Sequence, residues 1–303
     1  MNRRSLLLSI IIIILVITTT IVIAYYYIVG NILTPKYVHN VGVNKFRIKE
    51  IYPTKQGGRE WYINMDNPKA DPIFTIVSNI PITRNADDGS WSIANSAIRM
   101  SVITPPGTEP WKNVEMTGYV KVASTASTTS IFGSNNNNNE ESASISDIDW
   151  RARGGRHNSN VPCEGTALNG GIYTNGTVAW KKEIWHTGGY TDARGTGKAT
   201  NSILDTWIGW KVVMYNINNG NQAVKMESYL DDKDNNNWRK VNDVVDNGGW
   251  YAKSSDKVFY SADCGRPKDY IITNGGPIAT FRADNVAMNF KDLSIREIQP
   301  PTS

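Results

Sequence analysis

The sequence predicts an all-β protein, a two-sheet antiparallel sandwich preceded by one N-terminal transmembrane helix. Leucine, a common residue of helix cores, occurs only nine times in 303 residues. The chain instead has 32 Asn, 25 Gly, 10 Trp and 14 Tyr, which combines turn formers with aromatic residues that favour strands. Short segments with alternating apolar and polar residues follow one another from residue 43 to the end, and no window has the period of a helix.

The transmembrane helix is predicted from residues 6–29, which carry no charge. At 1.5 Å per residue they are long enough to cross a hydrocarbon core of about 30 Å. The run ends in three tyrosines at 25–27, which suits a membrane interface better than a cleavage site, so we expect an uncleaved signal anchor. Arg3 and Arg4 precede it and predict a single-pass protein of the cell membrane, with a cytoplasmic N-terminus and an extracellular domain.

The rest of the chain shows no shift in composition, which indicates a single extracellular domain. We divide the sequence into a cytoplasmic tip and anchor (1–30), a tether (31–44), the domain (45–298) and a tail (299–303). The predicted strands are 43–51, 73–77, 90–93, 98–103, 114–122, 147–153, 171–173, 178–185, 207–216, 224–229, 270–273, 278–281 and 288–297.

Charge and cysteine content limit the function further. Lys and Arg number 32 against 28 Asp and Glu, too small a surplus for a dedicated nucleic-acid-binding protein. Cys163 and Cys264 are the only cysteines, and outside the cell a disulfide between them is favoured over two free thiols. Asn175 begins the single Asn-x-Thr glycosylation sequon.

Two stretches resemble a known superfamily. Residues 228–232 (Ser-Tyr-Leu-Asp-Asp), followed by 237–241 (Asn-Trp-Arg-Lys-Val), are similar to a strand-turn-strand of concanavalin A-like lectin/glucanase domains. The closing segment 283–298 is similar to the last strand of that superfamily. The resemblance implies a jelly roll of two antiparallel sheets, in a superfamily whose members bind glycans or cleave them. It indicates the fold more than the chemistry.

The catalytic motifs of this superfamily are missing from the chain. Retaining glucanases of the fold carry Glu-x-Asp-x-x-Glu, because two carboxylates serve as nucleophile and acid/base. No Glu-x-Asp occurs in this sequence. If the protein is an enzyme, the sequence therefore favours a polysaccharide lyase over a glycoside hydrolase.

Basic residues and histidines gather between residues 147 and 190. A lyase acting on uronic-acid glycans by β-elimination needs a cation near the sugar carboxylate and a Tyr or His that moves the proton. The candidate catalytic residues are Arg151, Arg153, His157, Lys182, His186 and Tyr190. The alternative is that Asp147, Asp149, Arg151 and Arg153 alternate on one strand only to form a solvated outer face.

Binding a glycan requires less than cleaving one. Aromatic rings stack on sugar faces, and polar side chains bond to hydroxyl groups. The candidate substrate-binding residues are Arg156, Trp180, Trp185, Tyr229 and Trp238. No cofactor is required; Asp231, Asp232 and Asp234 offer oxygen ligands for a structural Ca²⁺, although a solvated acidic turn explains them as well.

These observations predict a membrane-anchored extracellular protein that binds polysaccharide on the concave face of a jelly roll. A polysaccharide lyase is the first alternative, and a structural or adhesion protein of the cell surface is the second. The sequence gives no indication of the oligomeric state.

Overall fold

The computed structural model describes residues 18–20, 42–76, 81–123, 147–155, 165–184, 190–218, 222–252 and 266–301. The chain forms two compact units, Met1–Asn40 and Val41–Ser303. Of the first unit only residues 18–20 are described, and they are helical. No helix in these ranges is long and apolar enough to cross a membrane, and most of the predicted anchor lies outside them.

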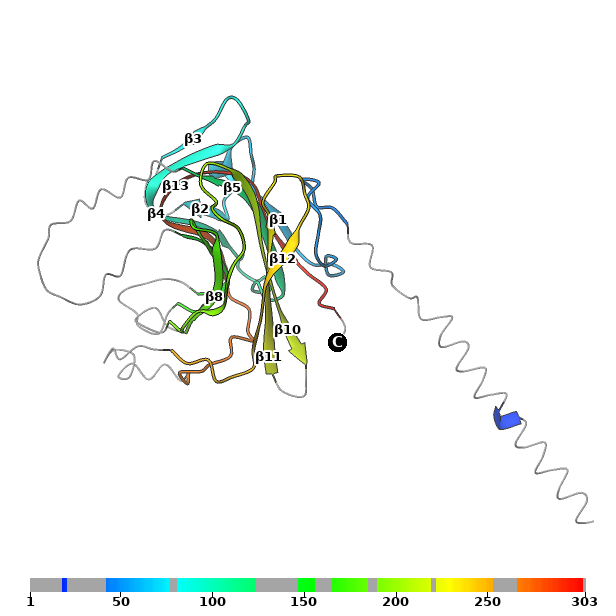
Figure 1. Ribbon diagram of the computed structural model, residues 1–303. Coiled ribbons are helices and arrows are strands. Elements are labelled where there is room, and N and C mark those ends of the chain that lie inside the picture. The colour runs from blue at the N-terminus through cyan, green and yellow to red at the C-terminus, as the bar shows by residue number, and fades with distance from the viewer. Residues whose placement is uncertain are drawn as a thin grey trace, which may run out of the picture. The chain divides into compact units, whose positions relative to one another are not determined.

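The described part of the second unit is built almost entirely of antiparallel strands (Figure 1). A short 3₁₀ helix, η1, covers Pro68–Ala70. The strands are β1 (Glu60–Tyr62), β2 (Phe74–Ile76), β3 (Ile82–Arg84), β4 (Trp91–Ile103), β5 (Val114–Val122), β6 (Asp147–Gly154), β7 (Ala167–Tyr173), β8 (Thr177–Glu183), β9 (Arg194–Lys198), β10 (Trp207–Asn218), β11 (Gln222–Asp231), β12 (Arg239–Asp246) and β13 (Ile278–Glu297).

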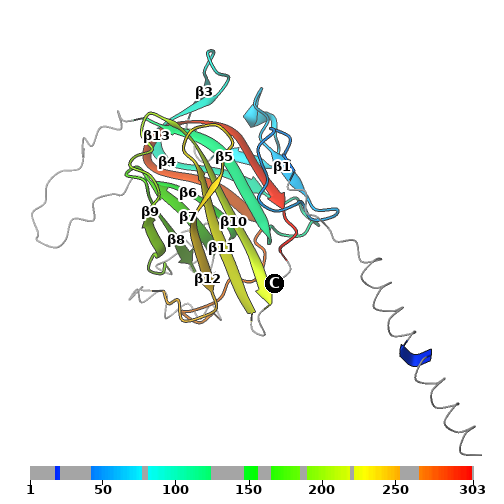
Figure 2. The same cartoon turned by 45° about the vertical axis from the view of Figure 1, so that its right-hand side comes forward.

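The strands form two packed layers that share β13. The hydrogen-bonded order is β12-β11-β10-β5-β13-β6-β7-β8-β9, with β1 and β4 also on β13 and with β2 and β3 on β4. Figure 2 shows β6 to β9 on one side of the domain and β10 to β12 on the other. The indole of Trp210 on β10 donates to the carbonyl of Gly170 on β7 over 3.2 Å, which joins the two layers. The all-β sandwich predicted from the sequence is confirmed.

Strand β13 belongs to both layers because it bends. Its first half pairs with β6 and its second half with β5. The pairing register shifts around Asn285 and again around Asp292, and both residues have a positive φ, of 55° and 57°. Bulges of this kind bend a strand and increase its twist, so one 20-residue strand serves two sheets.

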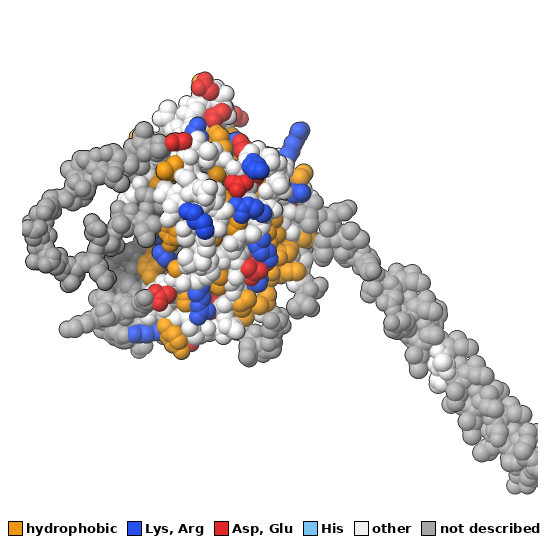
Figure 3. All heavy atoms as spheres, viewed as in Figure 1, with side chains coloured by type: hydrophobic (Ala, Val, Ile, Leu, Met, Phe, Trp, Pro, Cys, Tyr) orange, Lys and Arg blue, Asp and Glu red, His pale blue; other side chains and the backbone are white. Residues whose placement is uncertain are grey.

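The core lies between the layers and follows from the period-two pattern. Ile148, Trp150 and Ala152 of β6 point into it, as do Trp180 of β8 and Phe281 of β13. Their neighbours in the sequence therefore point to the outer face of the same strands. On the side of the domain seen in Figure 3, charged and other polar side chains surround small patches of hydrophobic ones.

Most strand predictions are confirmed, with two errors and four omissions. Residues 43–51 form no strand but a turn closed by a single bridge between Val43 and Lys49, and β1, β3, β9 and β12 were not predicted. The segments predicted as 90–93 and 98–103 are one strand, β4, and 278–281 and 288–297 are parts of β13. Residues 270–273 form no strand. Their carbonyl groups accept hydrogen bonds from side chains instead, Ile272 from Arg153 and Thr273 from Asn216, so they are not available for a strand ladder.

Candidate functional site

Charged side chains gather on the outer face of the layer formed by β4, β13, β6, β7 and β8. Asp149 and Arg151 of β6 lie on this face, opposite the core residue Trp150. The strand register brings further polar groups beside them: Arg282 of β13 pairs with Asp149, and Asn169 of β7 pairs with Arg151. Lys181 of β8 follows on the next strand, opposite Asn169. These four strands, β6, β13, β7 and β8, thus place polar side chains on one surface.

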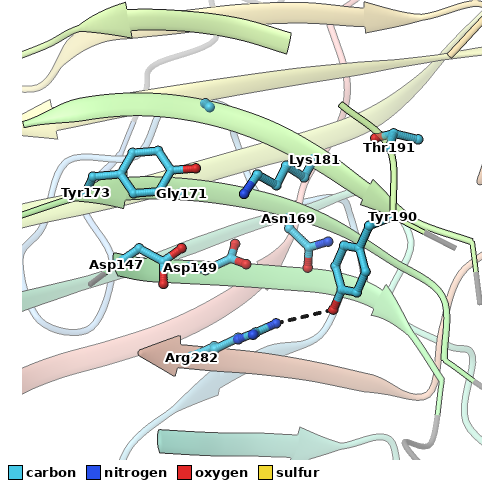
Figure 4. A pocket seen from close by; sticks show the side chains of 10 residues that line it. Asp147, Asp149, Asn169, Gly171, Tyr173, Lys181, Tyr190, Thr191 and Arg282 are labelled. Carbon is cyan, nitrogen blue, oxygen red and sulfur yellow. Dashed lines mark hydrogen bonds between the residues drawn. The ribbon is translucent and has the colours of Figure 1, made fainter. Parts of the chain in front are cut away.

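This surface contains a hollow of about 170 Å³, which we call the polar hollow. Its lining residues are Asp147, Asp149, Asn169, Gly171, Tyr173, Ala179, Lys181, Tyr190, Thr191 and Arg282. Figure 4 shows the side chains of Asp149, Asn169 and Tyr190 arranged around one common space. Gly171 has no side chain and Ala179 has only a methyl group, which leaves the floor of the hollow open between the polar groups.

Ion pairs hold the cations of this face in place. The carboxylate of Asp284 accepts from Arg99 over 2.8 Å and from Arg282 over 2.5 Å. Arg282 also donates to the hydroxyl of Tyr190 over 3.4 Å, the bond drawn in Figure 4. Arg151 forms an ion pair with the buried carboxylate of Glu183. The geometry of the guanidinium groups is therefore fixed by the protein before any ligand binds.

Some polar atoms of the polar hollow have no protein partner. Asn169 is 2% exposed, and neither its amide nitrogen nor its amide oxygen has a hydrogen-bond partner among the described residues. Oδ1 of Asp149 also has no hydrogen-bond partner among the described residues. Leaving a buried polar group unpaired costs about 1–3 kcal/mol. Unpaired donors and acceptors that line one hollow therefore indicate a place where a polar ligand binds.

The surroundings of the two aspartates raise their pKa values. Burial, followed by the negative charges of Asp149 and Asp284, raises the pKa of Asp147 to about 7. Burial also raises the pKa of Asp149, although Arg282 and Arg151 oppose this. Burial raises the pKa of the Tyr190 hydroxyl as well, against the effect of Arg151. At neutral pH Asp147 is therefore poised between its two protonation states, as functional groups often are.

A second hollow, of about 390 Å³, lies beside the first on the same face, and we call it the arginine hollow. It is lined by Thr75, Arg99, Ser101, Ile103, Arg151, Gly154, Gly155, Gly165, Ile278 and Thr280. The paired residues Asp149 and Arg282 line the polar hollow, and the next pair on the same two strands, Arg151 and Thr280, lines the arginine hollow. The two hollows thus lie next to each other on one face, over the strands from β8 to β2, and we call them together the groove.

The structure brings some of the predicted catalytic residues to this groove. Arg151 and Tyr190 line it. Arg153 is 1% exposed and donates to the carbonyls of Lys112 and Ile272 and to the side chain of Asn216. Its guanidinium is therefore used to fix loops. His157 and His186 lie outside the described residues.

Lys182 requires a correction, because we expected it to share a groove with Arg151. It is fully buried between the layers, where its ammonium group bonds to Asp246 over 2.8 Å. Lys182 lies on the same face of β8 as Trp180, and Trp180 is a core residue. Its neighbour Lys181 faces the polar hollow instead.

The aromatic residues predicted to stack on sugars are not in the groove. Trp180 is fully buried, and Tyr229 is 7% exposed on the opposite sheet, where its hydroxyl donates to Glu227. Trp238 packs on that sheet too, against Tyr119. Among the described residues, the aromatic side chains that line the groove are Tyr173 and Tyr190. The other predicted binding residues, Arg156 and Trp185, lie outside the described ranges, as do Cys163 and Cys264.

The predicted metal ligands and the sequon lie away from the groove. The buried Asp231 accepts from the Tyr119 hydroxyl and from backbone N–H groups of its own turn, whereas Asp232 pairs with Arg239 and Asp234 with Lys291. In the ranges that the structure describes, no group of three or more His, Cys, Asp or Glu is placed to hold a metal ion. Asn175 is exposed in the turn between β7 and β8.

Three groove residues were missed by the sequence reasoning: Arg99, Asn169 and Arg282. Arg99 of β4 and Arg282 of β13 are far from the predicted cluster in the sequence, whereas Asn169 of β7 lies within it but is neither basic nor a histidine. Only the strand register brings them beside Arg151. The sequence did indicate the orientation of Lys181. Because it follows Trp180, a residue typical of a core, on the same strand, its side chain is expected to point to the outer face.

Comparisons with known proteins give only distant similarity. No family model and no curated sequence matches the chain. The alginate lyase from Aplysia kurodai is 10% identical over 78% of this chain and 98% of its own, with a TM-score of 0.43. The endo-β-1,4-glucuronan lyase from the fungus Trichoderma reesei is 6% identical over 80% of this chain and 99% of its own, also with a TM-score of 0.43.

The botulinum neurotoxin serotype D binding domain is 10% identical, with a TM-score of 0.39. That match covers 75% of this chain but only 44% of the neurotoxin domain. Similarities this low assign no function.

Proposed function

We propose that the protein binds a glycan along the groove formed by the polar and arginine hollows, on a jelly-roll sandwich of the concanavalin A-like kind. The observation that carries this proposal is Asn169, a buried amide with both polar atoms unpartnered at the polar hollow. A side-chain amide offers donors and an acceptor at one point. A ring carrying several hydroxyl groups, each able to donate and accept, is a natural partner for it.

The rest of the groove agrees with a hydroxylated ligand. Asp149 and Tyr190 add acceptors and a donor, and Arg282 and Lys181 add charged donors. The rings of Tyr173 and Tyr190 provide apolar surface for a sugar face. The groove crosses β8, β7, β6, β13, β4 and β2, which at a strand spacing of about 4.8 Å makes it about 24 Å long. That length suits an oligosaccharide better than a single sugar.

Replacement of Asn169 by leucine tests the proposal. Because the amide bonds to nothing in the described protein, Asn169→Leu removes no internal hydrogen bond, and the variant is expected to be at least as stable as the wild type. Glycan binding should weaken at least tenfold, the effect of losing two good hydrogen bonds. Asn235→Leu, in an exposed turn, is the control.

The measurement is a glycan array followed by calorimetry on the full chain, purified in mild detergent. Equal binding by wild type and Asn169→Leu would contradict the proposal. Absence of binding to every glycan would favour the structural or adhesion protein.

A second candidate function is cleavage of uronic-acid glycans by β-elimination, which the position of Tyr190 favours. Its hydroxyl is near Arg282, and Asn169 and Arg151 occupy paired positions beside it. Asn169 and Arg151 would hold the sugar carboxylate. Tyr190 would take the proton from the carbon next to that carboxylate, the bond to the leaving oxygen would break, and a carbon–carbon double bond would form. Tyr190 would then pass the proton on to the leaving oxygen.

Ultraviolet absorbance of the unsaturated product tests this second candidate. Product formation by the wild type and its loss in Tyr190→Phe, with binding retained, would establish a lyase. Binding without product would leave a binding protein.

We also propose that residues 6–29 anchor the protein in the cell membrane, with the groove outside the cell. The support is the uncharged run and the two arginines before it. Protease added to intact cells should digest the domain and leave the N-terminus protected.

A further inference from the structure

Charge is distributed unevenly along the groove. Of the residues that line the arginine hollow, Arg99 and Arg151 are charged and none is acidic. The polar hollow has Asp147 and Asp149 in its lining, along with Arg282 and Lys181. One end of the groove therefore presents cations alone, and the other presents carboxylates as well.

The two guanidinium groups of the arginine hollow still have nitrogen atoms to offer a ligand. All three hydrogen bonds of Arg99 to described residues use Nη1, so Nε and Nη2 have no partner among those residues. Arg151 uses Nη2 for Glu183. Asp284 and Glu183, which pair with these arginines, are not part of the hollow's lining. Arginine forks with nitrogen atoms to spare bind carboxylate or sulfate with two parallel hydrogen bonds.

The polar hollow has the opposite preference. An anionic group beside Asp147 and Asp149 would meet one or two like charges in a partly buried site, which is unfavourable. The unpartnered Oδ1 of Asp149 instead accepts a hydrogen bond from a hydroxyl or an N–H group. This end of the groove therefore selects an uncharged sugar.

The site for an acidic group and the site for an uncharged sugar lie a short distance apart. Asp149 and Arg151 are separated by two residues on β6, or about 7 Å at the rise of an antiparallel strand. This is on the scale of neighbouring rings in one oligosaccharide. From this we infer that the ligand is a glycan in which an acidic sugar, held by Arg99 and Arg151, is linked to an uncharged sugar in the polar hollow. The inference rests on the proposed glycan binding and adds a class of ligand to it.

The test compares four oligosaccharides of equal length on the full chain in detergent, by calorimetry at moderate ionic strength. They are an alternating uronic acid–N-acetylhexosamine oligomer, the same oligomer with its carboxyl groups reduced, an oligomer of uronic acid alone, and an oligomer of neutral hexose. The alternating oligomer should bind about tenfold more tightly than each of the other three, the size of one charge-assisted contact. Equal or tighter binding of the all-uronic oligomer would overturn the inference.

Two variants separate this inference from the proposed function. Arg99→Gln should lower affinity for the alternating oligomer to that of its carboxyl-reduced form, whose own affinity should not change. Asp147→Asn should increase affinity for the all-uronic oligomer, a gain that misfolding cannot produce. If Arg99→Gln weakens both forms alike, the acidic site is refuted while glycan binding stands. If none of the four oligomers binds, both the inference and the proposed function fail.

Discussion

Lys181 and Lys182 are consecutive residues of β8 whose ammonium groups lie on opposite sides of the sheet. Lys181 lines the polar hollow, and Lys182 bonds to Asp246 in the interior over 2.8 Å. Burial lowers the pKa of Lys182, whereas Asp246 acts to raise it. The alternation of a strand thus gives one lysine to the groove and the other to the core.

Removing Lys182 should destabilise the fold. Lys182→Ala leaves the carboxylate of Asp246 buried without its partner, which is expected to lower the free energy of unfolding by about 3–5 kcal/mol. Lys181→Ala, at a partly exposed position, should cost less than about 1 kcal/mol but weaken glycan binding. Urea unfolding measures the first effect and calorimetry the second. The double variant Lys182→Met/Asp246→Leu should recover most of the lost stability, and a loss equal to that of the single variant would contradict the ion-pair explanation.

The pair also shows how far the sequence could predict the site. Alternation placed Asp147, Asp149 and Arg151 on one face of β6, as the structure has them. Arg153, predicted on the same face, departs from it, because the β6–β13 register shifts there, its φ is 60°, and its guanidinium bonds to Asn216 of β10. Alternation also placed Lys182 with Trp180, but alternation alone does not say which face is the interior. The interior face was identifiable only through the core position of Trp180.

The rest of the groove depends on pairing between distant strands. Asn169 and Arg282 lie beside Arg151 and Asp149 because of strand register. Asn169 is 18 residues from Arg151, but Arg282 is 133 residues from Asp149, and register between segments so far apart is set by the packing of the whole sandwich. Local patterns therefore predicted most of the long strands of the fold and only part of the site.

Tight packing between the layers makes Gly170 sensitive to substitution. A Cβ at this position would lie 2.7 Å from a methyl group of Val212 and 2.9 Å from the ring of Trp180. Gly170→Ala should therefore lower the free energy of unfolding by about 1–3 kcal/mol, the usual cost of overpacking. Gly197→Ala is the matched control, because no atom lies within 4 Å of its added Cβ. Thermal unfolding of both variants checks this, and equal melting temperatures would argue against close contact of the layers.

The raised pKa of Asp147 predicts a pH-dependent stability. The folded protein keeps this proton up to about pH 7, whereas the unfolded chain loses it near pH 4. Between these values the folded state binds more protons, so the free energy of unfolding falls as the pH rises. Asp147→Asn removes the charge that forms above pH 7 and should stabilise the protein by about 2 kcal/mol at pH 8, but hardly at pH 4. Urea unfolding at both pH values tests this, and an equal effect at both would show that the carboxyl titrates normally.

Arg153 links β6 to a segment that we predicted wrongly as a strand. Its guanidinium donates to the carbonyls of Lys112 and Ile272 over 2.8 and 2.7 Å, and to the side chain of Asn216 over 2.7 Å. These acceptors are neutral, and burial lowers the pKa of Arg153 to about 9. Arg153→Met keeps the volume of the side chain but leaves several buried oxygens unpaired.

Arg153→Met is expected to lower the free energy of unfolding by about 2–4 kcal/mol. Each unpaired buried group costs about 1–3 kcal/mol, and some of these groups regain a hydrogen bond to water. Hydrogen exchange provides a more specific readout than stability. The amides of Trp111 and Gly276, which bond to each other's carbonyls, should exchange faster than those of β10 and β11. Conversion of Arg99 to methionine, which breaks an ion pair on the partly exposed groove face, should leave these two amides protected. Uniform loss of protection in both variants would mean that Arg153 stabilises the sandwich as a whole and not the segment that it contacts.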